Sequence, residues 1–225
     1  MSAWIIDTET TSTKNTSQVI EFAYQTYDFG SESEPFGFYA RYGHTDPIAL
    51  GALATHHILP SELEDLPLFN SAEIDWPEYI IGHNVDFDWK MCGKPAAKRI
   101  CTLALARAAL PDLDTHSLSG LMYYFLGADA ETRDILRNAH SAGVDVDITS
   151  RVLNALLSEH YPDVASLEEL YLTCEEVRIP KKMSFGKFKG QPISAVDNGW
   201  RNWYRRQDDI DEYVLRAFDR YPYRG

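Results

Sequence analysis

The sequence has no long hydrophobic run. No stretch of apolar residues approaches the roughly 20 that a helix needs to cross a bilayer, and the opening residues, MSAWIIDTET, lack the basic start and apolar centre of a signal peptide. We therefore expect no membrane association and a cytoplasmic location. Hydrophobic residues still make up 44% of the chain, which is enough to bury a sizeable core.

Cysteine is scarce, and glycine-rich phosphate-binding motifs are lacking. The three cysteines are Cys92, Cys101 and Cys174, and none of their spacings is typical of a zinc site. We interpret them as buried thiols in a reducing compartment. The string GKFKG at 186–190 lacks the spacing of a nucleotide phosphate loop, and no G-x-G-x-x-G occurs, which excludes the usual dinucleotide-dependent enzymes.

Positive charge is scarce overall and unevenly distributed. The chain carries 21 Lys+Arg against 34 Asp+Glu, a formal net charge of −13, which is unusual for a protein that binds polyanions. Residues 1–177 hold 10 Lys+Arg against 28 Asp+Glu, whereas residues 178–206 hold 8 against 1 and residues 207–225 hold 3 against 5. This segregation indicates two parts with different tasks.

The pattern of apolar residues predicts an α/β fold with a mixed sheet. Residues 3–11 read as a buried strand that ends in acidic residues, and residues 19–29 and 35–42 read as a hairpin that extends it, with its turn at 30–34. Short buried strands then alternate with helical patterns, as in parallel α/β units. The longest helical pattern covers residues 143–161.

A break at Ile179-Pro180-Lys181-Lys182 predicts a domain boundary. We expect a main domain of residues 1–178 and a small C-terminal domain of residues 179–225. The C-terminal domain begins with a glycine-punctuated turn or short hairpin. It then continues into helices expected at 194–206 and 209–221.

Acidic residues follow the predicted strands at three places. Asp7 and Glu9 stand two apart on the first strand, so their side chains project from the same face. Asp88 closes the segment HNVDFD that follows the strand at 79–82, at the sheet edge where α/β folds place ligands. His140 and Asp145 lie at the entry to the long helix. Buried carboxylates of this kind are costly unless a cation neutralises them, so together the three groups indicate a metal site.

In this order and spacing the three groups resemble a known set of motifs. DTETT at 7–11, HNxxFD at 83–88 and HxxxxD at 140–145 are similar to the exonuclease motifs of the DnaQ-like superfamily, in its DEDDh subgroup with a histidine in the last motif. The likeness is greatest to the exonuclease X branch, because it continues into FGKFKG at 185–190, and it covers nearly the whole chain.

The resemblance implies a fold and an activity. The implied fold is an α/β, ribonuclease-H-like, mixed five-stranded sheet flanked by helices, with a small basic C-terminal α+β appendix. The implied activity is 3′-5′ exonuclease action on DNA, single-stranded and also double-stranded, with release of nucleoside 5′-monophosphates. A free 3′ end is the implied partner of the site.

The resemblance also assigns the chemistry to five residues. Two divalent cations, Mg²⁺ or Mn²⁺, about 4 Å apart would neutralise the scissile phosphate, and the carboxylates of Asp7, Glu9, Asp88 and Asp145 would supply the oxygen ligands that such cations require. The family pattern implies that Asp7 bridges both ions. His140 would take a proton from the attacking water, a task for which an imidazole suits neutral pH.

Contacts to the 3′-terminal nucleotide are implied for six residues, namely Thr10, Thr55, His56, His83, Asn84 and Phe87. Two positions depart from the family pattern. Ser12 stands where the family often has glycine, and Asp86 adds a carboxylate beside Asp88. From the sequence, Asp86 either faces solvent or perturbs metal affinity.

The basic segment 178–206 interleaves cations with aromatic residues. Cations that meet phosphates and aromatic faces that meet bases are the ingredients of sequence-tolerant nucleic-acid binding, although the aromatics could equally form the core of a small domain. We favour nucleic-acid binding through seven residues: Lys181, Lys182, Lys187, Lys189, Arg201, Arg205 and Arg206.

Two other functions stay open. The same motifs serve an exoribonuclease, and only the exonuclease X resemblance favours DNA. A noncatalytic nucleic-acid-binding accessory protein for replication or repair is the second alternative. The presence of all five active-site residues favours an enzyme over such a module.

Overall fold

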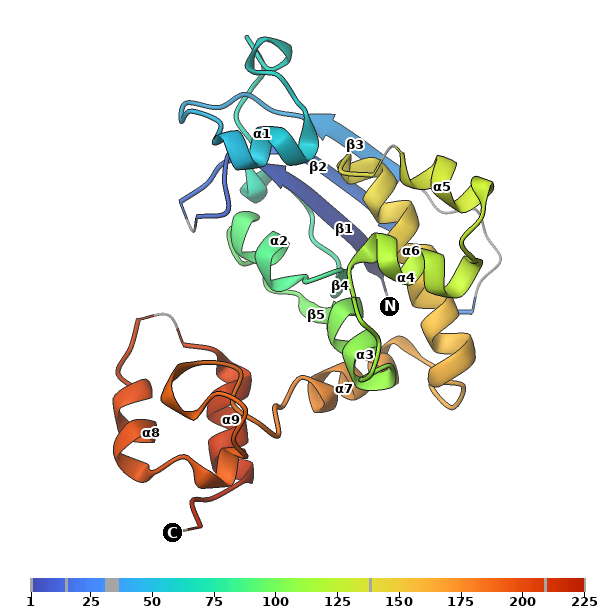
Figure 1. The fold of residues 1–225 in the computed structure, drawn as a ribbon. Helices are drawn as coiled ribbons and strands as arrows, with labels where there is room; N and C mark the ends of the chain where they lie inside the picture. Colours follow the sequence, from blue (N-terminus) through green and yellow to red (C-terminus); the bar gives the residue numbers. More distant parts are fainter. Residues whose placement is uncertain (1, 15, 31–36, 138, 209, 225) are drawn as a thin grey trace. The chain divides into compact units, whose positions relative to one another are not determined.

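The chain divides into two compact units, Met1–Leu172 and Thr173–Gly225. The computed structural model describes residues 2–14, 16–30, 37–137, 139–208 and 210–224 (Figure 1). The division falls within helix α7 (Leu167–Val177), just before the boundary expected at 178. Within the described ranges, no helix combines the length and apolar character needed to pass through a bilayer.

A mixed five-stranded sheet forms the centre of the first unit. Its strands run in the order β3-β2-β1-β4-β5. The β1–β2 and β2–β3 pairs are antiparallel, whereas β1–β4 and β4–β5 are parallel, as the sequence predicts. The turn expected at 30–34 lies almost wholly outside the described residues. The strands are β1 (Ala3–Thr10), β2 (Val19–Thr26), β3 (Gly37–Arg41), β4 (Tyr79–Gly82) and β5 (Lys98–Cys101).

The central strand β1 extends beyond its parallel neighbour. Ile5 is fully buried and pairs with Ile81 of β4, but β4 ends at Gly82 while β1 continues to Thr10. The end of β1 therefore lies at the edge where β4 stops. Because side chains alternate along a strand, Asp7 and Glu9 share one face there.

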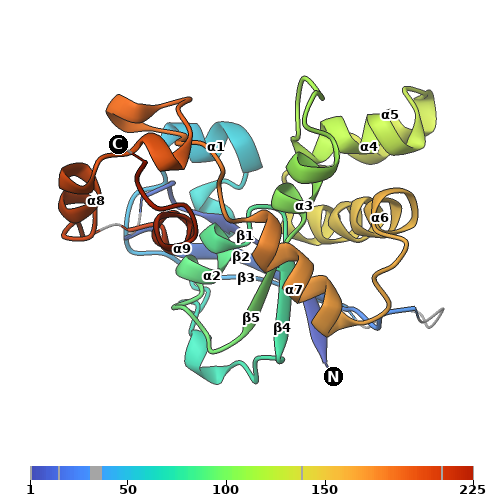
Figure 2. The ribbon, with the colours of Figure 1, turned by 90° about the horizontal axis from the view of Figure 1, so that it is seen from below.

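Helix α6 (Ala142–His160) packs along β1 and β2, and α3 and α4 pack against it. Ile148, Val152 and Leu156 are buried at helical spacing and form its inner stripe. Figures 1 and 2 show α4, α5 and α6 grouped beside the sheet. The other helices of this unit are α1 (Leu50–His56), α2 (Asp86–Met91), α3 (Thr102–Ala109), α4 (Leu118–Leu126) and α5 (Ala130–Leu136).

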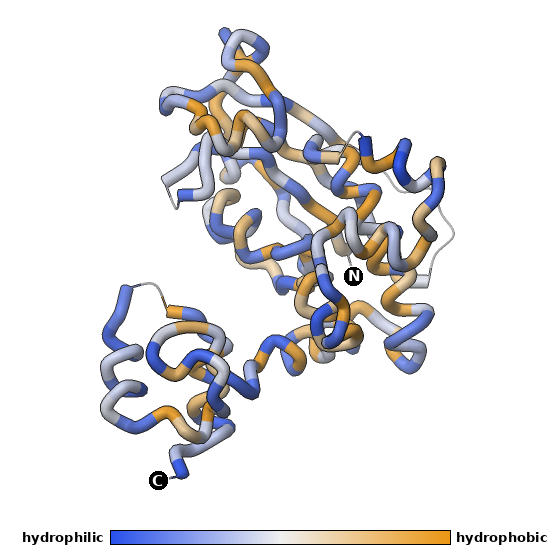
Figure 3. The backbone as a smooth tube through the Cα atoms, in the orientation of Figure 1, coloured by the Kyte–Doolittle hydropathy of each residue, from blue (hydrophilic) through white to orange (hydrophobic). Residues whose placement is uncertain are grey.

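The second unit has its own apolar core, which includes Met183, Ile193 and Phe218. Its helices α8 (Asn198–Tyr204) and α9 (Glu212–Arg220) are shorter than predicted because the side chains of Asp197 and Asp211 cap their N-termini. Residue 209, the expected start of the last helix, lies outside the described residues. At the expected turn or short hairpin there is one antiparallel bridge, between Lys182 and Pro192, with a 3₁₀ turn at Gly186–Phe188. In Figure 3, hydrophobic and hydrophilic stretches alternate along this unit.

Candidate active site

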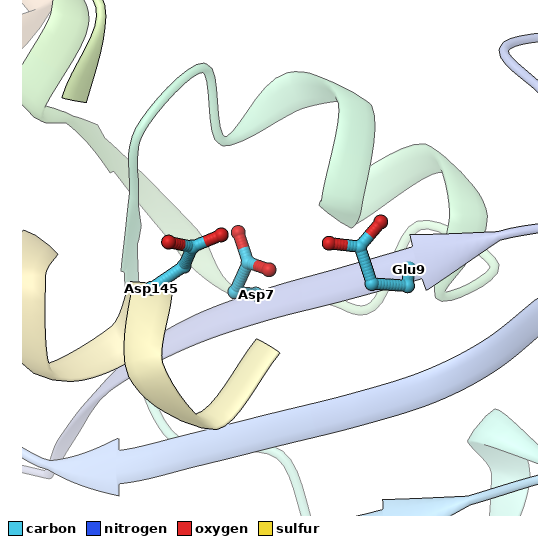
Figure 4. A group of neighbouring side chains, drawn as sticks. All are labelled: Asp7, Glu9 and Asp145. Carbon is cyan, nitrogen blue, oxygen red and sulfur yellow. The ribbon is translucent and has the colours of Figure 1, made fainter. Parts of the chain in front are cut away.

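Three predicted metal ligands come together at the end of β1. Asp7 and Glu9 extend from the strand, and Asp145 comes from the first turn of α6. One carboxylate oxygen from each residue lies within 4.8 Å of the others, and Figure 4 shows the three carboxylates turned toward a shared space. The fold therefore joins the first and third sequence motifs into one cluster.

Burial and mutual repulsion hold protons on this cluster. Burial, followed by the negative charges of Asp88, Asp145, Glu9 and Glu21, raises the pKa of Asp7 well above its ordinary value. Burial and then the charges of Asp145, Glu21 and Asp88 raise the pKa of Glu9 to about 8. A positive charge beside these groups would favour their ionised form.

Asp88, the ligand expected from the second motif, is fixed by Thr8. It lies in the first turn of α2 and is 4% exposed. Its Oδ1 accepts hydrogen bonds from the Thr8 backbone N–H (3.0 Å) and from Thr8 Oγ1 (2.7 Å). Asp88 thus supplies a hydrogen-bond acceptor for the backbone N–H of Thr8, on the part of β1 that extends beyond β4. Burial raises the pKa of Asp88 to about 7, although the Thr8 hydrogen bonds oppose the shift.

His140 lies in the loop before α6 and is exposed. Its backbone is left-handed, with φ of 70°, a conformation that is uncommon for residues other than glycine. The His140 N–H donates to Asp145 Oδ2 at 3.2 Å, so the backbone of the predicted base is tied to a predicted ligand. Burial raises the pKa of Asp145, while the charge and the N–H of His140 oppose that shift.

Glu21 on β2 is a fourth acidic residue near the cluster, and sequence reasoning missed it. It stands opposite Glu9 in the β1–β2 register and is 0% exposed. It could have been found as the single charged residue in the apolar strand segment VIEFAY. A carboxylate in a fully buried strand position requires partners.

The residues expected to contact the terminal nucleotide include one at the end of β1 and two on α1. Thr10 is buried, and its hydroxyl donates to the Ser12 carbonyl at 2.7 Å. Thr55 is exposed on α1. His56 is buried, its Nδ1 accepts from the Ile58 N–H at 2.9 Å, and burial lowers its pKa.

The ring nitrogens of His83, which was expected to contact the substrate, both have partners within the protein. Its Nδ1 lies 2.9 Å from Thr102 Oγ1 and its Nε2 lies 2.9 Å from the His116 carbonyl oxygen. Burial lowers its pKa to about 4. The ring therefore braces the second motif, whereas the neighbouring Asn84 is exposed and Phe87 is partly exposed.

The unexpected carboxylate of Asp86 has a cationic partner of its own. It forms an ion pair with Arg99 of β5, and the Arg99 guanidinium lies over the Trp89 ring at 4.1 Å. The three-residue group that could hold a metal, among the described residues, does not include Asp86.

Of the seven basic residues expected to bind nucleic acid, six are exposed: Lys181, Lys182, Lys187, Lys189, Arg205 and Arg206. Two of the six also form ion pairs at the surface. Lys187 lies 3.3 Å from Asp197, and Arg205 lies 2.8 Å from Asp219. Such exposed pairs are weak and can exchange for phosphate contacts.

Arg201 is a correction to that set. It is 4% exposed, and its guanidinium donates to four backbone carbonyls at 2.7–2.8 Å, so it fastens the core of the second unit and has no free face for phosphate. The aromatic residues divide between the two roles considered. Tyr204 is buried and stacks on Trp200, whereas Phe185 and Trp203 are 37% and 49% exposed.

Comparisons with known proteins agree with this geometry. The sequence profile of the RNase_T family, described as exonuclease, matches residues 4–153. No curated protein sequence matches the chain. Among solved structures, exonuclease X in complex with 5′ overhanging duplex DNA has a TM-score of 0.58 at 23% identity, over 75% of this chain and 97% of that chain.

Two exonuclease I structures give similar values. The zinc-bound E. coli exonuclease I complex with single-stranded DNA has a TM-score of 0.56 at 20% identity, over 80% of this chain and 43% of that chain. Exonuclease I from Methylocaldum szegediense has a TM-score of 0.56 at 18% identity, with 80% and 44% covered. The match thus spans nearly all of the exonuclease X chain but less than half of exonuclease I, and the ribonuclease-H-like fold predicted from the sequence is confirmed.

Proposed function

Because the chain belongs to the RNase_T exonuclease family, within the DnaQ-like superfamily of 3′-5′ exonucleases, we propose that it degrades DNA from a free 3′ end. Hydrolysis would proceed one nucleotide at a time and release nucleoside 5′-monophosphates. The observation that carries the proposal is the carboxylate cluster of Asp7, Glu9 and Asp145 at the end of β1.

The donor set of the site fits divalent cations. Mg²⁺ and Mn²⁺ require oxygen ligands, and the cluster offers three carboxylate oxygens within 4.8 Å of one another. Burial and the neighbouring carboxylates raise the pKa values of Asp7 and Glu9, and a bound cation would offset both effects. We assign two cations to Asp7, Glu9, Asp88 and Asp145. When bound, they would neutralise charge on the scissile phosphate and acidify the attacking water.

We assign the removal of a proton from that water to His140. His140 is exposed, and its backbone N–H is tied to Asp145, a member of the cluster. Imidazoles exchange protons near neutral pH. General-base catalysis of this kind typically contributes about 10²- to 10⁴-fold to the rate.

Five residues are proposed to receive the 3′-terminal nucleotide: Thr10, Thr55, His56, Asn84 and Phe87. Thr10 directly follows Glu9 on β1, and Asn84 and Phe87 precede Asp88. The partly exposed ring of Phe87 offers a face for base stacking. His83 is left out because both of its ring nitrogens already have partners.

DNA is the proposed substrate, in single-stranded and double-stranded form. The two kinds of neighbour were captured with DNA, exonuclease X with 5′ overhanging duplex DNA and E. coli exonuclease I with single-stranded DNA. An RNA substrate would use the same carboxylates, and the experiment below separates the two.

The second unit is proposed to hold the nucleic-acid backbone. Its exposed Lys181, Lys182 and Lys189 supply positive charge that the acidic first unit lacks. Exposed Phe185 and Trp203 add aromatic surface for unpaired bases.

A cytoplasmic location is part of the proposal. The three cysteines are buried and none forms a disulfide. Buried thiols of this kind are typical of a reducing compartment.

The test uses DNA and RNA oligonucleotides labelled at either end, single-stranded and duplex, incubated with Mg²⁺, Mn²⁺ or chelator. We expect a 3′ label on DNA to appear at once as mononucleotide, a 5′ label to pass through a descending ladder, and chelator to stop both. The Asp7→Asn variant is the matched control for contaminating nuclease. Faster release of a 5′ label would refute the polarity, and preferential degradation of RNA would refute the substrate.

A further inference from the structure

Glu21 is a completely buried carboxylate whose hydrogen bonds, in the described structure, all go to residues outside the metal cluster. Its Oε1 accepts from the Tyr39 hydroxyl and from Arg41 Nε at 3.1 Å. Its Oε2 accepts from the Ala142 backbone N–H at 2.7 Å. Burying a carboxylate is costly unless such partners compensate, so this arrangement holds two separate parts of the chain to β2.

The bond to Ala142 caps α6 from outside the helix. Ala142 is the first residue of α6, and the preceding Ser141 makes no side-chain capping bond. Helix N-termini leave backbone N–H groups without partners in the helix and favour negative charge. Glu21 supplies both the acceptor and the charge, from a strand far away in the sequence.

Tyr39 supports the same turn by direct packing. A Cβ placed on Gly143 would lie 3.3 Å from the Tyr39 ring, which is tighter than ordinary contact. Tyr39 therefore closes on the first turn of α6 while its hydroxyl donates to Glu21. This close approach favours a residue without a side chain at position 143.

The turn that Glu21 caps carries the catalytic groups of the third motif. Asp145 lies in the first turn of α6, and its Oδ2 accepts from the His140 N–H at 3.2 Å. Moving the start of α6 would move Asp145 and His140 together relative to Asp7 and Glu9 on β1. A displacement of about 1 Å at an active site can cost about 10²-fold in rate.

We propose that Glu21 is a positioning residue of the nuclease, which, with Tyr39 and Arg41, holds the first turn of α6 so that Asp145 and His140 meet the β1 carboxylates. This role rests on the proposed function for its catalytic consequence. The contact itself, from Glu21 to Ala142, is independent of any activity. Glu21 is not a ligand in this proposal, because its two oxygens are taken by three donors.

The test compares Glu21→Gln with Glu62→Gln, two variants that each remove one carboxylate partner of Arg41. Glu62 is exposed and accepts from Arg41 Nη1 at 2.8 Å, so it shares the arginine with Glu21 without capping α6. The amide of Glu21→Gln must turn its NH₂ group toward one of the three donors, so at least one hydrogen bond breaks. A milder variant, Tyr39→Phe, removes one donor and leaves the carboxylate.

Three quantities are measured on variants whose circular dichroism matches that of the wild type: turnover of labelled DNA, Mn²⁺ affinity by calorimetry, and hydrogen exchange of the Ala142 amide. For Glu21→Gln we expect turnover to fall about 10- to 100-fold with little change in KM, weaker Mn²⁺ binding, and faster exchange at Ala142. Tyr39→Phe should show the same changes in smaller degree. Glu62→Gln should stay within about twofold of the wild type, since exposed ion pairs contribute little.

A purely structural role predicts a different result and would overturn the proposal. In that case Glu21→Gln would melt at lower temperature, while the folded protein kept wild-type turnover and Mn²⁺ affinity. If Glu21→Gln does not fold, the same comparison is made with Tyr39→Phe. If the wild type proves inactive on every nucleic acid, the proposed function fails, and the exchange rate at Ala142 still decides whether Glu21 holds the turn.

Discussion

The two units of the chain differ in which charged groups they bring together. In the first unit, partly buried carboxylates gather at the end of β1, and cations pair with acidic partners, as Arg99 does with Asp86. In the second unit the exposed Lys181, Lys182 and Lys189 form no ion pair with any described residue. The first unit therefore has the chemistry to bind cations, and the second has the charge to bind phosphates.

One charged side chain from each unit illustrates the difference between a charge with partners in the protein and a charge that lies among like charges. Arg201 in the second unit has four carbonyl partners and needs nothing further. Asp7 in the first unit is surrounded by other carboxylates, which raise its pKa. We interpret a charge that the protein itself satisfies as structural, and a crowded group of carboxylates as a candidate site for a cation.

The largest effect is expected for Asp7→Asn, which should remove one carboxylate of the proposed metal site. Turnover should fall by about 10³-fold or more, equivalent to about 4 kcal/mol. The same change removes a repelling charge, so in chelator the variant should unfold at or above the wild-type temperature. Nuclease assays and calorimetry check both. Asp86→Asn, which lies outside the cluster, is the control, and equal losses in the two variants would contradict the assignment.

His140→Asn should lower turnover by roughly 10²-fold or more while Mn²⁺ binding persists, because the imidazole is removed and the backbone bond to Asp145 remains. Asparagine tolerates the left-handed backbone at this position. His57→Asn is a matched control, since His57 also has a left-handed backbone, with φ of 57°. Activity within about threefold of the wild type would show that His140 is not the general base.

The stability of the metal-free protein should fall as pH rises. The pKa of Glu9 is raised from 4.5 to about 8 in the folded state, so between these values the folded protein binds more protons than the unfolded chain and loses stability with rising pH. Each 1 kcal/mol of stability that is removed lowers Tm by about 2–4 °C for a protein of this size. Mg²⁺ should raise Tm more at pH 8 than at pH 5. In chelator, the Tm of Glu9→Gln should depend less on pH than the Tm of the wild type. A wild-type Tm that rises with pH in chelator over this range would contradict the raised pKa of Glu9 in the cluster.

The smallest effect on chemistry is expected in the second unit. Replacing Lys181, Lys182, Lys187 and Lys189 with glutamine should weaken binding to long DNA. The slope of log affinity against log salt should become shallower by about 0.7 for each phosphate of a single strand that the variant no longer neutralises. Hydrolysis of a small phosphodiester should be unchanged. An unaltered affinity for DNA at several salt concentrations would contradict the proposal that the second unit binds the nucleic-acid backbone.

Local patterns were enough to predict much of the first unit. Strand periodicity predicted the shared face of Asp7 and Glu9, and the helix start near Asp145 followed from the apolar stripe of α6. The sequence marks Glu21 as the single charge in an apolar strand, but its role could not be predicted because its partners Tyr39, Arg41 and Ala142 are distant in the sequence.

Misjudged positions share a physical cause. Arg201 looked like a phosphate ligand because its charge is visible in the sequence, whereas the four carbonyls that satisfy it are scattered between Ile193 and Tyr221. His83 was expected at the substrate because its motif resembles that of the family, whereas its ring partners Thr102 and His116 are distant in the sequence. Charge and residue type are local properties, but burial and hydrogen bonding depend on the whole fold.

The most direct test of the central claim is the anomalous scattering of Mn²⁺ in crystals grown with nucleoside 5′-monophosphate. The account predicts two peaks about 4 Å apart at the end of β1, one of them bound by Asp7, Glu9 and Asp145 and the other beside Asp88. Crystals that bind the nucleotide there but show no Mn²⁺ peak among these carboxylates would contradict it.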